Sequence, residues 1–198
     1  SAEILTTPPY RNDGENPSSV GVHLRWILSN SWTSKFISNK GDDKKTLFIS
    51  FHADSLHPSA SGTMVYVPGS SGVPDRFQIR GLKGVQVNEL PKYGSVTFTP
   101  QERFLGEVRS RQFSEILIKN LAQNQLPIHQ NRAIRNIIQR EGTAFVPAVI
   151  RYNKSSTKVL IEVANLNNPV DAENLSDPEF RSRFAESVCQ AIKAYFKN

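Results

Sequence analysis

The residue types best suited to chemistry in this sequence are a histidine and a glutamate that belong to two apolar runs. His52 directly follows residues 46–51, and Glu162 lies within residues 158–163, where most other side chains are valine, leucine or isoleucine. Such runs are typical of strands that are covered on both faces, and α/β folds place their functional groups where such strands end. An imidazole that binds a metal ion and a carboxylate that accepts a proton are the groups that a metal-activated water requires.

Each residue also has a plain structural interpretation. A histidine beside an apolar strand commonly serves only as a hydrogen-bonding residue, and the carboxylate of Glu162 could be held by an arginine. Without such a partner, a buried carboxylate costs several kcal/mol. The other histidines, His23, His57 and His129, have no spacing to His52 that requires a shared metal ion.

The segments around both residues resemble those of the zinc-dependent N-acetylmuramoyl-L-alanine amidases of bacterial cell walls. Residues 50–55, Ser-Phe-His-Ala-Asp-Ser, resemble the family's Ser-x-His-x-Asn/Asp-Ser strand end, and residues 62–66 resemble its Gly-x-x-Val-Tyr strand. Residues 159–162, Val-Leu-Ile-Glu, and residues 167–171, Asn-Asn-Pro-Val-Asp, are similar to its last strand and the turn that follows. Residues 175–196 resemble its closing helix.

This resemblance implies a peptidoglycan hydrolase of the periplasm or the cell exterior. It would cleave the amide between N-acetylmuramic acid and the L-alanine of the stem peptide. Zinc is the implied cofactor, with His52 as a metal ligand and Glu162 as the catalytic residue that takes a proton from the zinc-bound water. The alternative is a catalytically inactive amidase-like domain that binds cell-wall material or a partner protein.

The zinc site that the resemblance implies is incomplete in this chain. The family holds zinc with two histidines and a glutamate, and its first histidine and its glutamate lie in a segment that would precede Ser1. Because zinc sites need at least three protein ligands, we expect no fully coordinated zinc in the chain alone. Asn165, Asn167 and Asn168 follow Glu162 and are interpreted as turn formers, with contact of one amide to the glycan or stem peptide as the alternative.

Composition is ordinary for a soluble globular protein. The 198 residues, with 38% hydrophobic and 21% charged residues, predict one domain over residues 1–198. The resemblance implies that this domain is amidase-like and N-terminally incomplete relative to the family. The absence of a long apolar run predicts no membrane span. The formal net charge of +6 favours an anionic partner, but the basic residues are scattered, so we expect no nucleic-acid binding. The lone cysteine, Cys189, is expected to be a small buried hydrophobe.

The expected architecture is a three-layer α/β fold with a mixed or mainly parallel sheet. Strands are predicted over residues 46–51, 63–67, 146–151 and 158–163, and helices over about 20–30, 101–124 and 176–196. For the last helix, Ser176 and Glu179 have the spacing of a capping box. Residues 68–100 are rich in proline and glycine and are predicted to form an extended insertion, a small β excursion on the rim of the His52 site.

Overall fold

A mixed four-stranded sheet forms the centre of the computed structural model, which describes residues 11–12, 17–79, 85–86, 88–140 and 142–197. Its strands lie in the order β2 (Leu47–Asp54), β10 (Thr157–Asn165), β3 (Met64–Tyr66) and β7 (Ile134–Arg135). β10 is parallel to β2 and antiparallel to β3, and β7 is parallel to β3. The predicted mixed α/β sheet is therefore confirmed.

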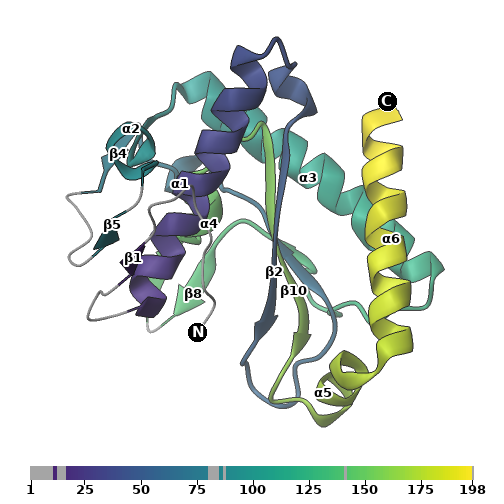
Figure 1. The fold of residues 1–198 in the computed structure, drawn as a ribbon. Helices are drawn as coiled ribbons and strands as arrows, with labels where there is room; N and C mark the ends of the chain where they lie inside the picture. Colours follow the sequence, from purple (N-terminus) through teal and green to yellow (C-terminus); the bar gives the residue numbers. More distant parts are fainter. Residues whose placement is uncertain (1–10, 13–16, 80–84, 87, 141, 198) are drawn as a thin grey trace.

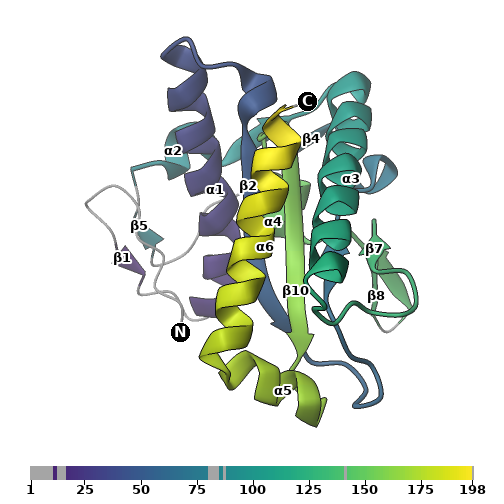
Figure 2. The same ribbon diagram turned by 90° about the vertical axis from the view of Figure 1, so that its right-hand side faces the viewer.

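Two long helices, α3 (Pro100–Gln123) and α6 (Pro178–Lys197), pack against one another and cover one face of the sheet (Figure 2). They bury apolar residues that recur at helical spacing, which is the pattern that drives a helix onto a sheet. The core on this face contains Val65, Val67, Phe113, Leu117, Leu121, Val159, Ile161, Phe180, Phe184 and Val188.

The opposite face is covered by the short helix α4 (Ala148–Arg151), and α1 (Pro17–Ser38) packs on α4 (Figure 1). Val146, Val149 and Ile150 contact Tyr66 and Leu160 of the sheet.

The remaining elements are short. They are η1 (Asp43–Lys45), η2 (Ser70–Gly72), α5 (Pro169–Ser176) and the strand pairs β1 (Arg11–Asn12) with β5 (Val85–Gln86) and β8 (Ile138–Arg140) with β9 (Thr143–Phe145). None of the described helices is both long and apolar enough to cross a membrane.

The predicted strand over residues 146–151 is wrong, because this segment forms the helix α4. Pro147 is its N-cap residue, with a φ of −53°. A short buried turn of helix and a short buried strand both consist of consecutive apolar residues, so their sequences look alike. Two other predictions were wrong in detail: Cys189 is exposed, and the predicted helix over 20–30 extends to Ser38.

The start of α6 is capped by a different residue from the one predicted. The carboxylate of Asp177 accepts hydrogen bonds from the backbone N–H groups of Glu179 at 2.9 Å and Phe180 at 3.1 Å. The Ser176 hydroxyl instead donates to the carbonyl of Ala172 in α5. Two helices therefore meet at this point, where the spacing of Ser176 and Glu179 predicted one helix start.

The insertion contains the small β excursion that was predicted, and its strand β6 lies toward the end of the sheet remote from His52. β4 (Arg76–Gln78) pairs antiparallel with β6 (Ser95–Thr97), and α2 (Leu90–Tyr93) lies between them in sequence. Ser95 and Thr97 line a cavity with Asp43, which precedes β2. The cause is the direction of β3: it runs antiparallel to β10, so the chain leaves it toward the amino end of β10 and away from Glu162.

Candidate active site

His52 and Glu162 are neighbours across the two central strands. They are register partners in the parallel pair of β2 and β10. Partners in adjacent parallel strands point to the same face of the sheet, and their backbones are about 4.8 Å apart. His52 lies within β2, two residues before its end, and was predicted to follow the strand. The fold thus brings together the two residues that the sequence predicts for one site.

Glu162 is a buried carboxyl group that forms no ion pair with any residue that the structure describes. Glu162 is 8% exposed, and no described residue donates a hydrogen bond to its Oε2 atom. Burial, and to a lesser degree the negative charge of Asp54, raises the pKa of Glu162 to about 7. A carboxyl group with this pKa can both accept and donate a proton near neutral pH, which is what a general base that later acts as an acid needs.

His52 is half-buried and held by its strand neighbour. The Ser50 hydroxyl lies 2.9 Å from its Nε2 atom, because residues two apart on a strand point to the same face. Burial and the positive charge of Arg25 lower the pKa of His52, against a smaller opposing effect of Asp54. The imidazole is therefore neutral at neutral pH, and no described residue hydrogen-bonds to its Nδ1 atom.

A tyrosine and an arginine, which sequence reasoning did not single out for the site, extend this face. Tyr66 pairs with Leu160, two residues before Glu162, and its hydroxyl hydrogen-bonds to Arg135 of β7. Burial raises the pKa of Tyr66, the Arg135 charge and hydrogen bond oppose this, and the charges of Asp54 and Glu162 add to it to a smaller degree. The Val-Tyr motif indicated the strand of Tyr66, whereas Arg135 lies on a two-residue strand without a sequence signal.

The three asparagines after Glu162 hold the loop that follows β2. Asn165 accepts a hydrogen bond from the Leu56 N–H at 2.9 Å and donates to the carbonyls of His57 at 3.0 Å and Ala60 at 2.8 Å. Asn167 donates to the Leu56 carbonyl, and Asn168 caps the start of α5. These contacts support the structural interpretation of the amides.

Asp171 fixes the end of the same loop. It is 1% exposed and accepts hydrogen bonds from the backbone N–H groups of Gly62 at 2.9 Å and Asn165 at 2.8 Å. Gly62 has a φ of +84°, and a Cβ atom there would lie 2.6 Å from the backbone of Ile128, so only glycine fits. The loop beside His52 and Asp54 is thus attached to the residues that follow Glu162.

The described residues do not by themselves fit a zinc ion. No group of three histidine, cysteine, aspartate or glutamate side chains among them could hold a metal ion. The Nδ1 atoms of the other three histidines are occupied: His23 accepts from Trp26, His57 is paired with Ser59, and His129 accepts from the Asn131 N–H. His52 remains the one residue of the predicted ligand set in this part of the chain.

Residues 22–194 match a protein family described as N-acetylmuramoyl-L-alanine amidase, Amidase_3. Among solved structures, the amidase Ami1 from Mycobacterium smegmatis is similar with a TM-score of 0.52 and 17% identity, over 85% of this chain and 60% of that chain. Ami1 from Mycobacterium abscessus has a TM-score of 0.51 and 19% identity, over 85% and 61%.

An N-acetylmuramoyl-L-alanine amidase from Clostridium difficile 630 has a TM-score of 0.50 and 12% identity, over 89% of this chain and 66% of that chain. At these identities the structures establish a shared fold. The chain spans less than two thirds of the length of each of these three structures. A search of curated proteins finds no match.

Proposed function

Since the chain belongs to the N-acetylmuramoyl-L-alanine amidase family, we propose that it hydrolyses peptidoglycan at the amide between N-acetylmuramic acid and the L-alanine of the stem peptide. One observation carries the proposal: the two residues that match the family's site motifs, His52 and Glu162, are register partners on one face of the sheet. We further propose that the protein acts in the periplasm or outside the cell, at the cell wall.

Glu162 is the proposed proton-transfer residue. In its ionised form it takes a proton from the attacking water, whose oxygen bonds to the lactyl carbonyl carbon. In its protonated form it returns the proton to the alanine nitrogen as the amide bond breaks. The products are a lactyl carboxylic acid on the sugar and a peptide with a free amino end. A pKa of about 7 suits both steps, because neither protonation state is strongly disfavoured near neutral pH.

His52 is the proposed metal-binding residue of the site, and zinc is the proposed cofactor. Zinc would supply a Lewis acid for the scissile carbonyl. The neutral state of His52 suits a metal ligand, and the Ser50 hydroxyl on Nε2 leaves Nδ1 for the ion. Further ligands are required, because the described residues do not offer three donors at one place.

The test is digestion of purified peptidoglycan by the chain, at zinc concentrations high enough to occupy a weak site, followed by mass spectrometry of the released peptides. The expected product is a stem peptide that begins with L-alanine. The variant Glu162→Gln keeps the shape of the side chain but cannot transfer the proton, and should lower the rate by about a hundredfold or more. Glu173→Gln, an exposed position on α5, is the matched control and should leave the rate unchanged.

Release of such peptides at equal rates by the Glu162→Gln variant and the unchanged chain would contradict the role of Glu162. Sedimentation of the chain with peptidoglycan, without any peptide release in the presence of zinc, would instead support the alternative of an inactive wall-binding domain. The two assays therefore distinguish the hydrolase from the binding domain in one preparation.

A further inference from the structure

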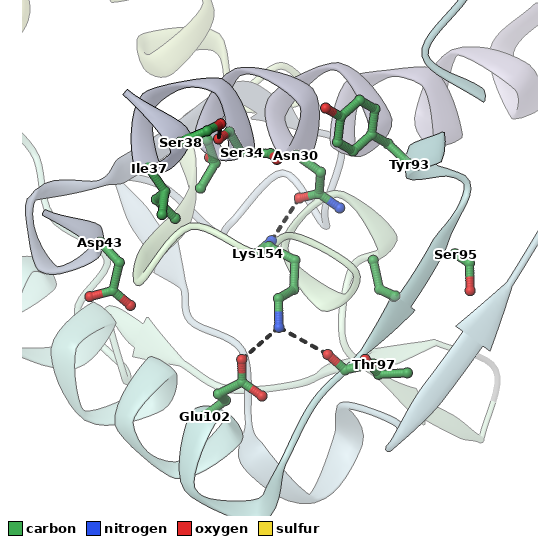
Figure 3. A pocket seen from close by; sticks show the side chains of 12 residues that line it. Asn30, Ser34, Ile37, Ser38, Asp43, Tyr93, Ser95, Thr97, Glu102 and Lys154 are labelled. Carbon is green, nitrogen blue, oxygen red and sulfur yellow. Dashed lines mark hydrogen bonds and ion pairs between the residues drawn. The ribbon is translucent and has the colours of Figure 1, made fainter. Parts of the chain in front are cut away.

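A second cluster of ionisable groups lies at the amino end of β10. Its member on this strand, Lys158, precedes Glu162 by four residues and thus lies about 13 Å from it along the backbone. The cluster lines a cavity of about 290 Å³ between η1, α3 and the residues before β10. The neighbouring cavity of about 490 Å³ in Figure 3 shares Asp43, Glu102 and Lys154 with it. Neither cavity contains His52 or Glu162.

Lys158 is the unusual member of this cluster. It is 6% exposed, and its Nζ atom donates to the Ser155 carbonyl at 2.8 Å and lies 5.6 Å from the centre of the Phe98 ring. No described carboxylate forms an ion pair with it. Burial, with a smaller effect of the Lys154 charge, lowers the pKa of Lys158 to about 7. A buried ammonium group without an anionic partner is costly, so this position disfavours the charged form as it stands.

The surrounding residues leave room for this amine. Gly106 of α3 faces Lys158, and a Cβ atom at position 106 would lie 3.3 Å from Nζ. One helical turn later, the Ser110 hydroxyl accepts the backbone N–H of Lys158 at 3.0 Å. The helix is thereby attached to the strand at Ser110, while at Gly106 it stays clear of the amine.

Positive charge exceeds negative charge around the cavity. Its lining contains four basic residues, Lys44, Arg109, Lys154 and Lys158, and two acidic ones, Asp43 and Glu102. Glu102 forms an ion pair with Lys154 at 2.6 Å, which is marked in Figure 3. The Glu102 charge opposes the lowering of the Lys158 pKa but does not reverse it. Arg109 forms no ion pair with any described residue and contributes to lowering the pKa of Lys158.

We propose that this cavity is a binding site for a small oxyanion, a phosphate or carboxylate group, which Lys158 and Arg109 bind together. Its volume of about 290 Å³ is near the lower limit for ligand pockets, so it suits a small ligand that carries such a group. A bound oxyanion supplies the negative charge that Lys158 lacks, and charge-assisted hydrogen bonds are the strong ones in proteins. The site is separate from the proposed amidase centre and does not depend on that proposal.

Isothermal titration of the whole chain with inorganic phosphate and, in a second arm, with acetate tests the site. We expect saturable binding of one anion per chain, and the arm with the higher affinity identifies the group. Because an anion raises the pKa of Lys158, binding near pH 7 should take up protons. Titrations in two buffers of different ionisation enthalpy measure this uptake.

Variants assign the binding to the cavity. Lys158→Met and Arg109→Gln should each weaken the preferred anion by about tenfold or more, whereas Arg111→Gln should change its affinity by less than about twofold. Arg111 is a matched control because it lies on the same helix and is paired with Glu107, outside the cavity. Unchanged affinity in both Lys158→Met and Arg109→Gln, or no saturable binding of either anion to the unchanged chain, would overturn the proposal.

Discussion

At the scale of single residues, the candidate site shows how burial determines protonation. Glu162 and His52 sit side by side, and burial shifts both toward their neutral forms: it raises the pKa of the acid and lowers that of the base. The strand motifs allowed the proximity of the two residues to be predicted, since both occur within a few positions of recognisable neighbours. The pairing of Tyr66 with Arg135 could not be predicted, because it depends on which strands become neighbours in the sheet.

The raised pKa of Glu162 predicts a pH-dependent stability. The folded chain keeps the Glu162 proton up to about pH 7, whereas the unfolded chain loses it near the ordinary value of 4.5. The contribution of Glu162 to the free energy of unfolding is therefore fully present below pH 4.5 and is lost as the pH rises through about 7. With about 1.4 kcal/mol per pKa unit, reduced because water reaches part of the site, the ionised group costs about 2 kcal/mol.

Glu162→Gln should remove this cost. In urea unfolding, we expect the variant to be more stable than the unchanged chain by about 2 kcal/mol at pH 8.5 and equal to it within about 0.5 kcal/mol at pH 4. Glu173→Gln on the exposed side of α5 should be neutral at both pH values. An equal effect of Glu162→Gln at both pH values would show that the carboxylate is not disfavoured by burial.

At the scale of elements, the long strongly patterned segments were the predictable ones. β10, α3 and α6 agree with the sequence within a few residues, because each has an apolar pattern long enough to distinguish strand from helix. α4 was missed because four residues are too few to show a period. The start of α6 was assigned to Ser176, since the capping-box pattern does not show that another helix, α5, already ends there.

The cap of α6 gives a test of this difference. Asp177 satisfies two backbone N–H groups of the first turn, whereas the Ser176 hydroxyl bonds within α5. Asp177→Ala should therefore lower the free energy of unfolding by about 1 kcal/mol, and Ser176→Ala by less than about 0.5 kcal/mol. Urea unfolding of both variants measures this. A larger loss of unfolding free energy for Ser176→Ala than for Asp177→Ala would show that Ser176 caps α6, as the sequence pattern predicts.

At the scale of the whole molecule, the parallel pairing of β2 with β10 gives the sheet two chemically different ends. The carboxyl half presents His52, Glu162 and Asp54, and the amino end adjoins the basic cavity around Lys158. The sequence allowed the first end to be predicted, because the motifs that mark it belong to two recognisable strands. The second end combines η1, α3 and β10, which are distant in sequence, so only the folded chain brings its charges together.

The last prediction concerns zinc binding by the chain as a whole. The described residues supply His52 but no group of three metal donors, and each missing ligand removes a large part of the binding free energy of zinc. We therefore expect isothermal titration with zinc to show weak binding, far from the tight one-to-one association of a complete site. His52→Ala should weaken it further, and Glu173→Gln should not. Tight one-to-one binding that is lost in His52→Ala would show that other residues of this chain complete the ligand set of the proposed site.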